Sequence, residues 1–254
     1  MFGRLSSLLS DPRAFLIDLL LSLPAILLGL TLHEAAHAYA AYRLGDPTAK
    51  MMGRLSLNPL AHLDPVGTLA LVFIGFGWAR PVPVNPRYYK RPRRDDLIVS
   101  IAGIVTNLAV MLIALAVLYA ALPLWLRGPG ADIDPRAIYQ MPYAIPSMVS
   151  AYRSASISTY LLAILVNIAA TNLVLGAFNL IPLPPLDGYH VFNDLILNRS
   201  SLFASRNAQM ISQLVLMALL ISGKTGEALS FVVVHVFGTL GNGAYAILHA
   251  LGAI

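Results

Sequence analysis

The chain has 254 residues, of which 57% are hydrophobic and only 11% are charged, and its formal net charge is +5. Soluble globular proteins carry about 25% charged and about 45–50% apolar residues, so this composition excludes an ordinary soluble protein. The chain contains no cysteine, so a bound metal must be held by histidines and carboxylates rather than by thiolates. The excess Lys and Arg residues lie between apolar segments, where anionic lipid accounts for them, and no nucleic-acid partner is expected.

Long apolar segments alternate with polar loops along the chain. Because a hydrocarbon core needs about 20 apolar residues in helical form, such segments indicate membrane spans. The predicted spans lie near residues 15–42, 97–122, 157–181, 208–223 and 228–252. A shorter apolar stretch, 66–79, lies within a segment, 55–85, that predicts a membrane-associated hairpin or a re-entrant element. The sequence therefore predicts an all-α polytopic membrane protein of about five to six transmembrane helices, forming one membrane-embedded domain over residues 1–254.

The basic residues indicate how these spans are oriented. Nine of the seventeen Lys and Arg residues lie between Arg43 and Arg94. Short loops rich in Lys and Arg stay in the cytoplasm, so this loop is expected on the cytoplasmic side of the cell membrane. The first span then runs inward, the second outward and the third inward. The residues that follow Ile181 are therefore expected at the cytoplasmic end.

The first predicted span contains the motif H-E-x-x-H, formed by His33, Glu34 and His37. In a helix, the two histidines lie one turn apart on the same face and can grip one metal ion. Ionisable groups are costly in hydrocarbon, so three of them within five residues indicate a shared polar function. The alternative is a polar seam between helices, with hydrogen-bonded histidines and a protonated Glu34.

Two histidines make an incomplete zinc site, because catalytic zinc usually takes three protein ligands. Asp187 is the candidate for the third ligand. It follows the proline-rich run 182–185, which prevents a regular helix, and irregular backbone is tolerated at membrane depth only where it is buried in protein or lines a cavity. The orientation of the spans brings Asp187 to the same end as His37, provided that 66–79 does not cross the bilayer. The alternative is an interfacial turn in which Asp187 caps a helix.

Three blocks of sequence extend this pattern: HEAAHAYAAYRLGDPTAKMMGRLSLNPLAHLDPVGT, then GWARPVPVNPRYYKRPRRDDLIVSIAGIVTNL, then NLIPLPPLDG. Together they resemble the site-2 protease family of intramembrane zinc metallopeptidases, in its compact bacterial form without PDZ or CBS domains. The resemblance covers about residues 15–120 and 157–195. It implies that His33, His37 and Asp187 bind one zinc ion per chain and that Glu34 is the general base.

The resemblance also implies a role for Asn107, the last residue of a Gly-x-x-x-Asn pattern that begins at Gly103. In the family this asparagine is expected beside the active site, where it stabilises the oxyanion or places the substrate. The sequence departs from the family at the next position, since the usual Gly-Pro pair is Gly103-Ile104 here. That departure leaves Asn107 in place and puts the local helix geometry in doubt.

The implied function is an intramembrane zinc endopeptidase that hydrolyses transmembrane segments of membrane proteins near the cytoplasmic side, as in regulated intramembrane proteolysis. Its expected partners are a transmembrane helical substrate and the lipid bilayer, and the sequence gives no indication of oligomeric state. A metal or ion transporter is one alternative, but it would be expected to show inverted repeats, which are not visible. A catalytically inactive membrane scaffold is another, but no ligand or base is missing.

Further polar residues have more than one interpretation. His62 and Asp64 favour a turn role within 55–85 over additional metal ligands. His190 is expected either to support Asp187 or to lie at the membrane interface. Asn172, on the third predicted span with two other asparagines, could line the active-site cleft or bond between helices.

Overall fold

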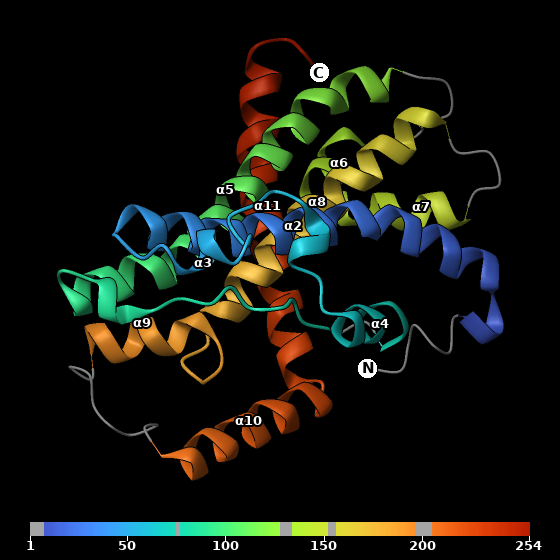
Figure 1. Ribbon diagram of the computed structural model, residues 1–254. Coiled ribbons are helices and arrows are strands. Elements are labelled where there is room, and N and C mark those ends of the chain that lie inside the picture. The colour runs from blue at the N-terminus through green and yellow to red at the C-terminus, as the bar shows by residue number, and fades with distance from the viewer. Residues whose placement is uncertain (1–7, 75–76, 128–133, 152–155, 197–204) are drawn as a thin grey trace.

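Four long helices dominate the computed structural model, which describes residues 8–74, 77–127, 134–151, 156–196 and 205–254 (Figure 1). They are α2 (Pro12–Arg43), α5 (Pro92–Leu126), α8 (Ile157–Asn179) and α11 (Lys224–Ala250). Each is long and apolar enough to cross a membrane. The part of the chain that the structure describes forms no strand, and the predicted all-α polytopic fold class is confirmed.

The fourth predicted span, 208–223, corresponds to helix α10 (Arg206–Ile221), which has only 16 residues. At 1.5 Å per residue it is about 24 Å long, which is less than a typical hydrocarbon core of about 30 Å. Among the described residues, four helices are therefore long enough to span a membrane, against the five to six predicted. Helix α10 is too short to count as a further span.

Shorter helices connect the long ones. They are α3 (Thr48–Met51), α4 (Pro65–Ile74), α6 (Pro135–Gln140), α7 (Ile145–Ala151) and α9 (Asp187–Leu195), with 3-10 turns at Pro59–Ala61, Pro86–Tyr88 and Pro142–Ala144. Five of these eight elements begin with proline, whose fixed φ suits the first helical turn and whose missing N–H is not needed there.

Local sequence signals set where the long helices begin. The Asp11 carboxylate accepts hydrogen bonds from the backbone N–H groups of Arg13 and Ala14 and so caps α2. The Ser156 hydroxyl caps α8 in the same way. Helix α5 begins at Pro92, five residues before the predicted apolar span, because its first turn is the charged run 93–96, which a hydropathy search does not include.

The core lies where α2, α5 and α8 pack together, and these three helices cross one another in Figure 1. Helices α5 and α8 supply most of its buried apolar side chains, and α6, α7 and α11 cover one end of it. Its members include Leu115, Leu118 and Leu122 of α5, Leu162, Val166 and Leu173 of α8, Tyr139 of α6 and Phe237 of α11. This packing fixes the relative positions of the three helices on which the site is built.

The segment predicted as a hairpin or re-entrant element folds back on itself. Its helix α4 has ten residues, too few to cross a bilayer. Leu63 and Ala79 form an isolated antiparallel bridge, and the Arg80 N–H donates to the His62 carbonyl at 2.8 Å. The two ends of the segment therefore lie side by side. Its placement in the membrane remains a prediction.

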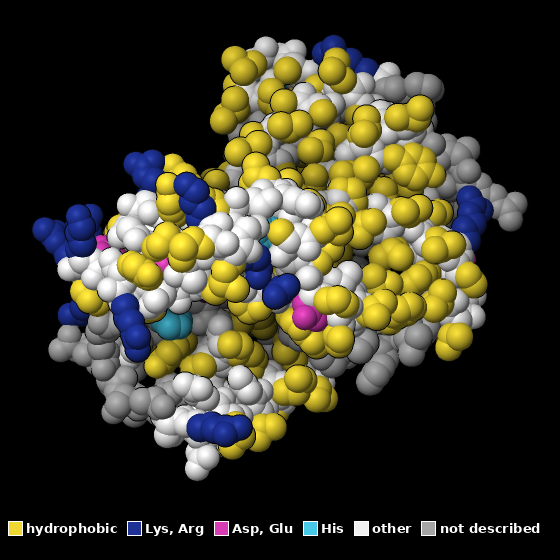
Figure 2. Space-filling view, in the orientation of Figure 1, with side chains coloured by type: hydrophobic (Ala, Val, Ile, Leu, Met, Phe, Trp, Pro, Cys, Tyr) yellow, Lys and Arg dark blue, Asp and Glu magenta, His cyan; other side chains and the backbone are white. Residues whose placement is uncertain are grey.

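The surface has a composition that suits a bilayer. Figure 2 shows hydrophobic side chains over most of the visible face, while several Lys and Arg side chains gather at its left edge, over α3 and the start of α5. Exposed apolar residues occur on every long helix, among them Leu20 of α2, Ile113 of α5, Leu161 of α8 and Phe231 of α11. Large exposed apolar areas of this kind mark a surface that contacts lipid or another protein.

Candidate metal centre

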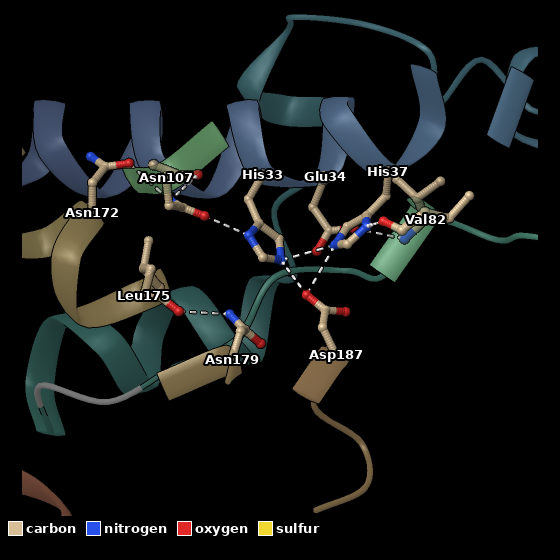
Figure 3. Close-up of polar contacts among 11 residues, drawn as sticks. His33, Glu34, His37, Val82, Asn107, Asn172, Leu175, Asn179 and Asp187 are labelled. Atoms are coloured by element: carbon tan, nitrogen blue, oxygen red, sulfur yellow. Dashed lines mark hydrogen bonds and ion pairs between the residues drawn. The ribbon is translucent and has the colours of Figure 1, made fainter. Parts of the chain in front are cut away.

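The two histidines of the H-E-x-x-H motif converge because α2 is regular around them. His33 and His37 are 6% and 8% exposed, and their Nε2 atoms lie 3.0 Å apart (Figure 3). The rings meet edge to face, with their planes 83° apart. Two imidazole nitrogens are thus directed at one point on the inner face of α2.

Asp187 reaches the same point from a position 150 residues further along the chain. It is the first residue of α9, directly after the proline-rich turn that ends α8. Its Oδ2 atom lies 3.2 Å from the Nε2 of His33 and 3.2 Å from the Nε2 of His37. The turn doubles back tightly, since a Cβ on Gly188 would overlap the Leu180 carbonyl. The predicted trio is therefore brought together as a group that could hold a metal ion.

The donor atoms of this trio fit a zinc ion. A tetrahedral zinc with bonds of about 2.0–2.1 Å holds its ligand atoms about 3.3 Å apart, close to the three distances observed. The His37 Nδ1 donates to the Val99 carbonyl at 2.8 Å, so its Nε2 carries a lone pair. The buried Oδ2 atom of Asp187 has no hydrogen-bond donor. Acceptor atoms crowded in this way are stabilised by a cation between them.

The charge state of Asp187 agrees with a ligand role. Burial raises the pKa of this carboxyl, but when protons rather than a metal lie between the three side chains, hydrogen bonds and charge from His33 and His37 outweigh burial and hold the pKa below its usual range. The carboxylate is therefore ionised at neutral pH and available to a metal.

Gly103 of α5 makes room for both histidine rings. A Cβ at this position would lie 2.5 Å from the His37 Nε2 and 2.6 Å from the His33 Cε1. Helix α5 runs without interruption through Gly103-Ile104, so the departure from the family's Gly-Pro pair does not break the helix here. The glycine is required because the α5 backbone lies directly against the site.

Glu34 lies beside the two histidines and is held by a backbone amide. Its Oε2 accepts a hydrogen bond from the Val82 N–H at 2.8 Å (Figure 3). The neighbours of Val82 are Pro81 and Pro83, which have no N–H, so Val82 supplies the only backbone donor of this tripeptide. The partly buried carboxylate is thus fixed through one oxygen.

The extended segment 80–85, which carries Val82, is anchored at both ends. The buried Arg54 guanidinium donates to the Arg80 carbonyl at 2.5 Å, and the Asn85 N–H donates to the Asp46 carboxylate at 2.6 Å. The supporting roles of Val82, Arg54 and Asp46 were not predicted from the sequence. The spacing of Pro81 and Pro83 around a single amide was the available signal.

Comparison with known proteins agrees with this geometry. A family model described as Peptidase family M50 matches residues 22–223, which is most of the chain. The chain belongs to peptidase family M50. This is the site-2 protease family, so the resemblance found in the sequence is confirmed, and the chain is a member of a zinc metalloprotease family.

Curated relatives of this M50 peptidase carry names of the same kind. It is 42% identical over 171 residues to a Bacillus subtilis protein named "Putative zinc metalloprotease YwhC", a match that covers 67% of each chain. It is 30% identical over 183 residues to a Mycolicibacterium smegmatis protein named "Putative zinc metalloprotease Rip2", covering 70% of this chain and 58% of that protein. No solved structure matches the chain at a significant level. Zinc is therefore the metal expected for the His33, His37 and Asp187 group.

Asn107 lies in the M50 site, but away from the point where the ligand atoms meet. It is fully buried, and its Oδ1 is 2.5 Å from the His33 Nδ1. Its Nδ2 donates to the Asn172 Oδ1 at 2.8 Å. The asparagine therefore contacts a ligand histidine through one end of its amide and another asparagine through the other.

The remaining candidates have structural partners. His62 is fully buried and its Nε2 donates to the Ser56 carbonyl, while the Asp64 carboxylate accepts from the Gly67 N–H at the start of α4, so both serve the turn. His190 pairs with Asp96 of α5 at 3.3 Å, and this carboxylate raises the pKa of His190. His190 thus links α9 to α5 instead of contacting the Asp187 carboxylate.

Proposed function

We propose that this M50 peptidase is an intramembrane endopeptidase that uses one zinc ion, held by His33, His37 and Asp187, to hydrolyse peptide bonds within transmembrane segments of membrane proteins. The observation that carries the proposal is that both histidines belong to α2, a helix long and apolar enough to cross a membrane. His37 lies six residues before the last residue of that helix, which is about 9 Å along its axis. A site at this depth is reached most directly by substrates that are themselves in the membrane.

The side chains divide the chemistry among them. When bound, zinc supplies a Lewis acid that polarises the scissile carbonyl and activates water. Glu34 acts as the general base: the Val82 amide holds its Oε2, and its Oε1 accepts a proton from the attacking water. Glu34 then delivers this proton to the leaving amine. The Val82 amide thus keeps the carboxylate in one orientation through both transfers.

The proposed substrate is a single-span helix of another membrane protein. The amides of such a helix are engaged in internal hydrogen bonds. The helix must therefore unwind locally before the scissile carbonyl can reach the water that Glu34 deprotonates. Glycine or proline near the cleaved bond lowers the cost of unwinding. We therefore expect substrates of regulated intramembrane proteolysis with helix-breaking residues near their cytoplasmic end.

The catalytic test compares the wild type with Glu34→Gln. Each purified protein is reconstituted in lipid vesicles with synthetic single-span helices that carry a Gly-Pro pair at successive depths, and with casein as a soluble control. The wild type should cut within the span, and Glu34→Gln should be slower by at least about 100-fold while keeping its zinc. Cleavage by Glu34→Gln at the wild-type rate, or cleavage of casein alone, would contradict the proposal.

The proposed cytoplasmic side of the site can be tested because the chain has no native cysteine. Lys90 and Arg127 are exposed and lie just before and just after α5. Lys90→Cys should be protected from a membrane-impermeant maleimide in intact cells and labelled in inverted vesicles, and Arg127→Cys should show the opposite pattern. The reverse result for the pair would place the site at the other face.

A further inference from the structure

A chain of buried amides runs from His33 across three helices. The His33 Nδ1 on α2 meets the Asn107 Oδ1 on α5, and the Asn107 Nδ2 meets the Asn172 Oδ1 on α8 (Figure 3). Both asparagine side chains are 0% exposed. The chain ends where the Asn172 Nδ2 donates to the Ile168 carbonyl of the same helix at 2.8 Å.

The direction of every hydrogen bond in this chain follows from its last member. The Ile168 carbonyl can only accept, so Asn172 must turn its NH2 group toward it and its Oδ1 toward α5. Asn107 must then donate through Nδ2, which leaves its Oδ1 facing His33. An acceptor at that point requires the proton of His33 on Nδ1 and a lone pair on Nε2.

Turning either amide over would place oxygen against oxygen and NH2 against NH2 within a buried environment. Asn107 has a second reason to keep its orientation, because its Nδ2 also lies 3.4 Å from the Gly29 carbonyl. Gly29 allows this approach, since a Cβ there would lie 3.3 Å from the Asn172 Oδ1 and 2.8 Å from Leu175. The arrangement therefore has one consistent set of donors and acceptors.

From this geometry we infer that Asn107 and Asn172 are positioning residues that hold His33 in the tautomer able to bind the metal through Nε2, an inference that rests on the proposed zinc site. His37 obtains the same tautomer from a backbone carbonyl, that of Val99, which no side-chain substitution removes. The two histidines are thus supported differently. Only the His33 support can be deleted by mutation.

This assignment differs from the oxyanion role that family resemblance suggests for Asn107. An amide NH2 group has two hydrogens, and here they are directed at the Asn172 Oδ1 and the Gly29 carbonyl. No hydrogen remains to bind a substrate oxygen. Asn107 therefore acts through His33.

The experiment measures the zinc dissociation constant of the detergent-purified full chain by competition with a chelator. Asn107→Leu removes the amide oxygen that accepts from His33. Asn172→Leu removes the amide that orients the Asn107 side chain. Supports of this kind change metal affinity by about 10–100-fold, so we expect a loss of about 100-fold for the first variant and about 10-fold for the second. Asn107→Asp should restore the affinity, because a neutral carboxyl accepts from His33 and donates to Asn172.

Asn179→Leu is the matched control. Asn179 lies on the same helix, and its Nδ2 donates to the Leu175 carbonyl at 3.0 Å in the same way as Asn172 bonds to Ile168, but no contact links it to His33. It should bind zinc as the wild type does. Cobalt substitution adds a second readout, since the d–d absorption of bound Co²⁺ should change in Asn107→Leu and return in Asn107→Asp.

The outcomes separate this inference from the zinc site on which it rests. Wild-type zinc affinity in both leucine variants, with affinity lost in His37→Ala, would overturn the inference and leave the zinc site intact. Asn107→Asp that binds zinc as weakly as Asn107→Leu would also overturn it. If His37→Ala kept the wild-type affinity, the zinc site would fail, and the inference with it. An Asn107→Leu variant with full zinc affinity and a loss confined to kcat would support the oxyanion role instead.

Discussion

The sharpest structural prediction concerns Gly103→Ala, a substitution of one methyl group at the back of the metal site. The added Cβ would lie 2.5 Å from the His37 Nε2 and 2.7 Å from the His33 Nδ1, where ordinary contact begins at 3.4 Å. Relieving the closest contact requires a movement of about 0.9 Å by the rings or by α5. Neither ring can move freely, because each is hydrogen-bonded through Nδ1 to α5 itself.

The size of this movement sets the expected effect. Metal sites tolerate changes of about 0.2 Å in ligand distance, so a displacement several times larger disrupts coordination. Loss of a group that only supports a ligand already weakens metal binding by about 10–100-fold, so displacing the ligands themselves should cost at least the upper end of that range. We therefore expect Gly103→Ala to bind zinc at least about 100-fold more weakly than the wild type, measured by chelator competition, and to lose some stability through overpacking.

Gly176→Ala provides the matched control, because it adds the same methyl group to a buried glycine of α8. Its Cβ would lie 3.4 Å from the nearest atom of Leu108, which is ordinary contact. This variant should keep its zinc affinity. Wild-type zinc binding by Gly103→Ala would show that α5 does not lie against the two rings and would refute the packing argument.

Two further predictions concern Glu34 and the α11 interface. Val82→Pro removes the amide that holds Glu34 and should lower kcat by about 10–100-fold with zinc content unchanged, since a hydrogen bond to a charged group is worth about 1.5–3 kcal/mol. Val84→Pro, which removes no recorded hydrogen bond from the same segment, is the control, and equal rates for the two variants would contradict the role of Val82. Gly241→Ala should lower the thermal unfolding temperature without changing zinc affinity, because its Cβ would overlap the Tyr139 carbonyl. An unchanged melting curve would argue against close packing of α11 on α6.

Short-range patterns predicted the parts of the site that depend on helix geometry. His33, Glu34 and His37 could be predicted as site residues because an i, i+4 spacing places the two histidines on one face of a helix. Asp187 could be predicted as the third ligand because the proline run before it prevents a regular helix, and irregular backbone at membrane depth is buried in protein or lines a cavity. The limits of the helices were less accurate where charge begins a helix, as in α5, or where an apolar stretch is short, as in α10.

The supports of the site depend on contacts between distant segments, and the sequence alone did not specify them. Asn172 was one of three asparagines on its helix, and only the packing of α8 against α5 distinguishes it from Asn179. Val82 acts through a backbone N–H, which carries no side-chain signature. Gly103 was visible as part of a pattern, but its contact with both histidine rings follows only from the crossing of α2 and α5.

Helix α5 supplies no metal ligand, yet its residues help to position all three ligands. The residues concerned recur at spacings of three and four and so share one face of the helix: Asp96, Val99, Gly103 and Asn107. Asp96 pairs with His190 on α9, the helix that begins at Asp187. The Val99 carbonyl accepts from the His37 Nδ1, and the Asn107 Oδ1 accepts from the His33 Nδ1. Gly103 leaves space for both histidine rings. A rotation or shift of α5 would therefore disturb all three ligands at once. Because α5 packs against α2, α8 and α9, its position determines whether the metal site forms, although it supplies no ligand itself.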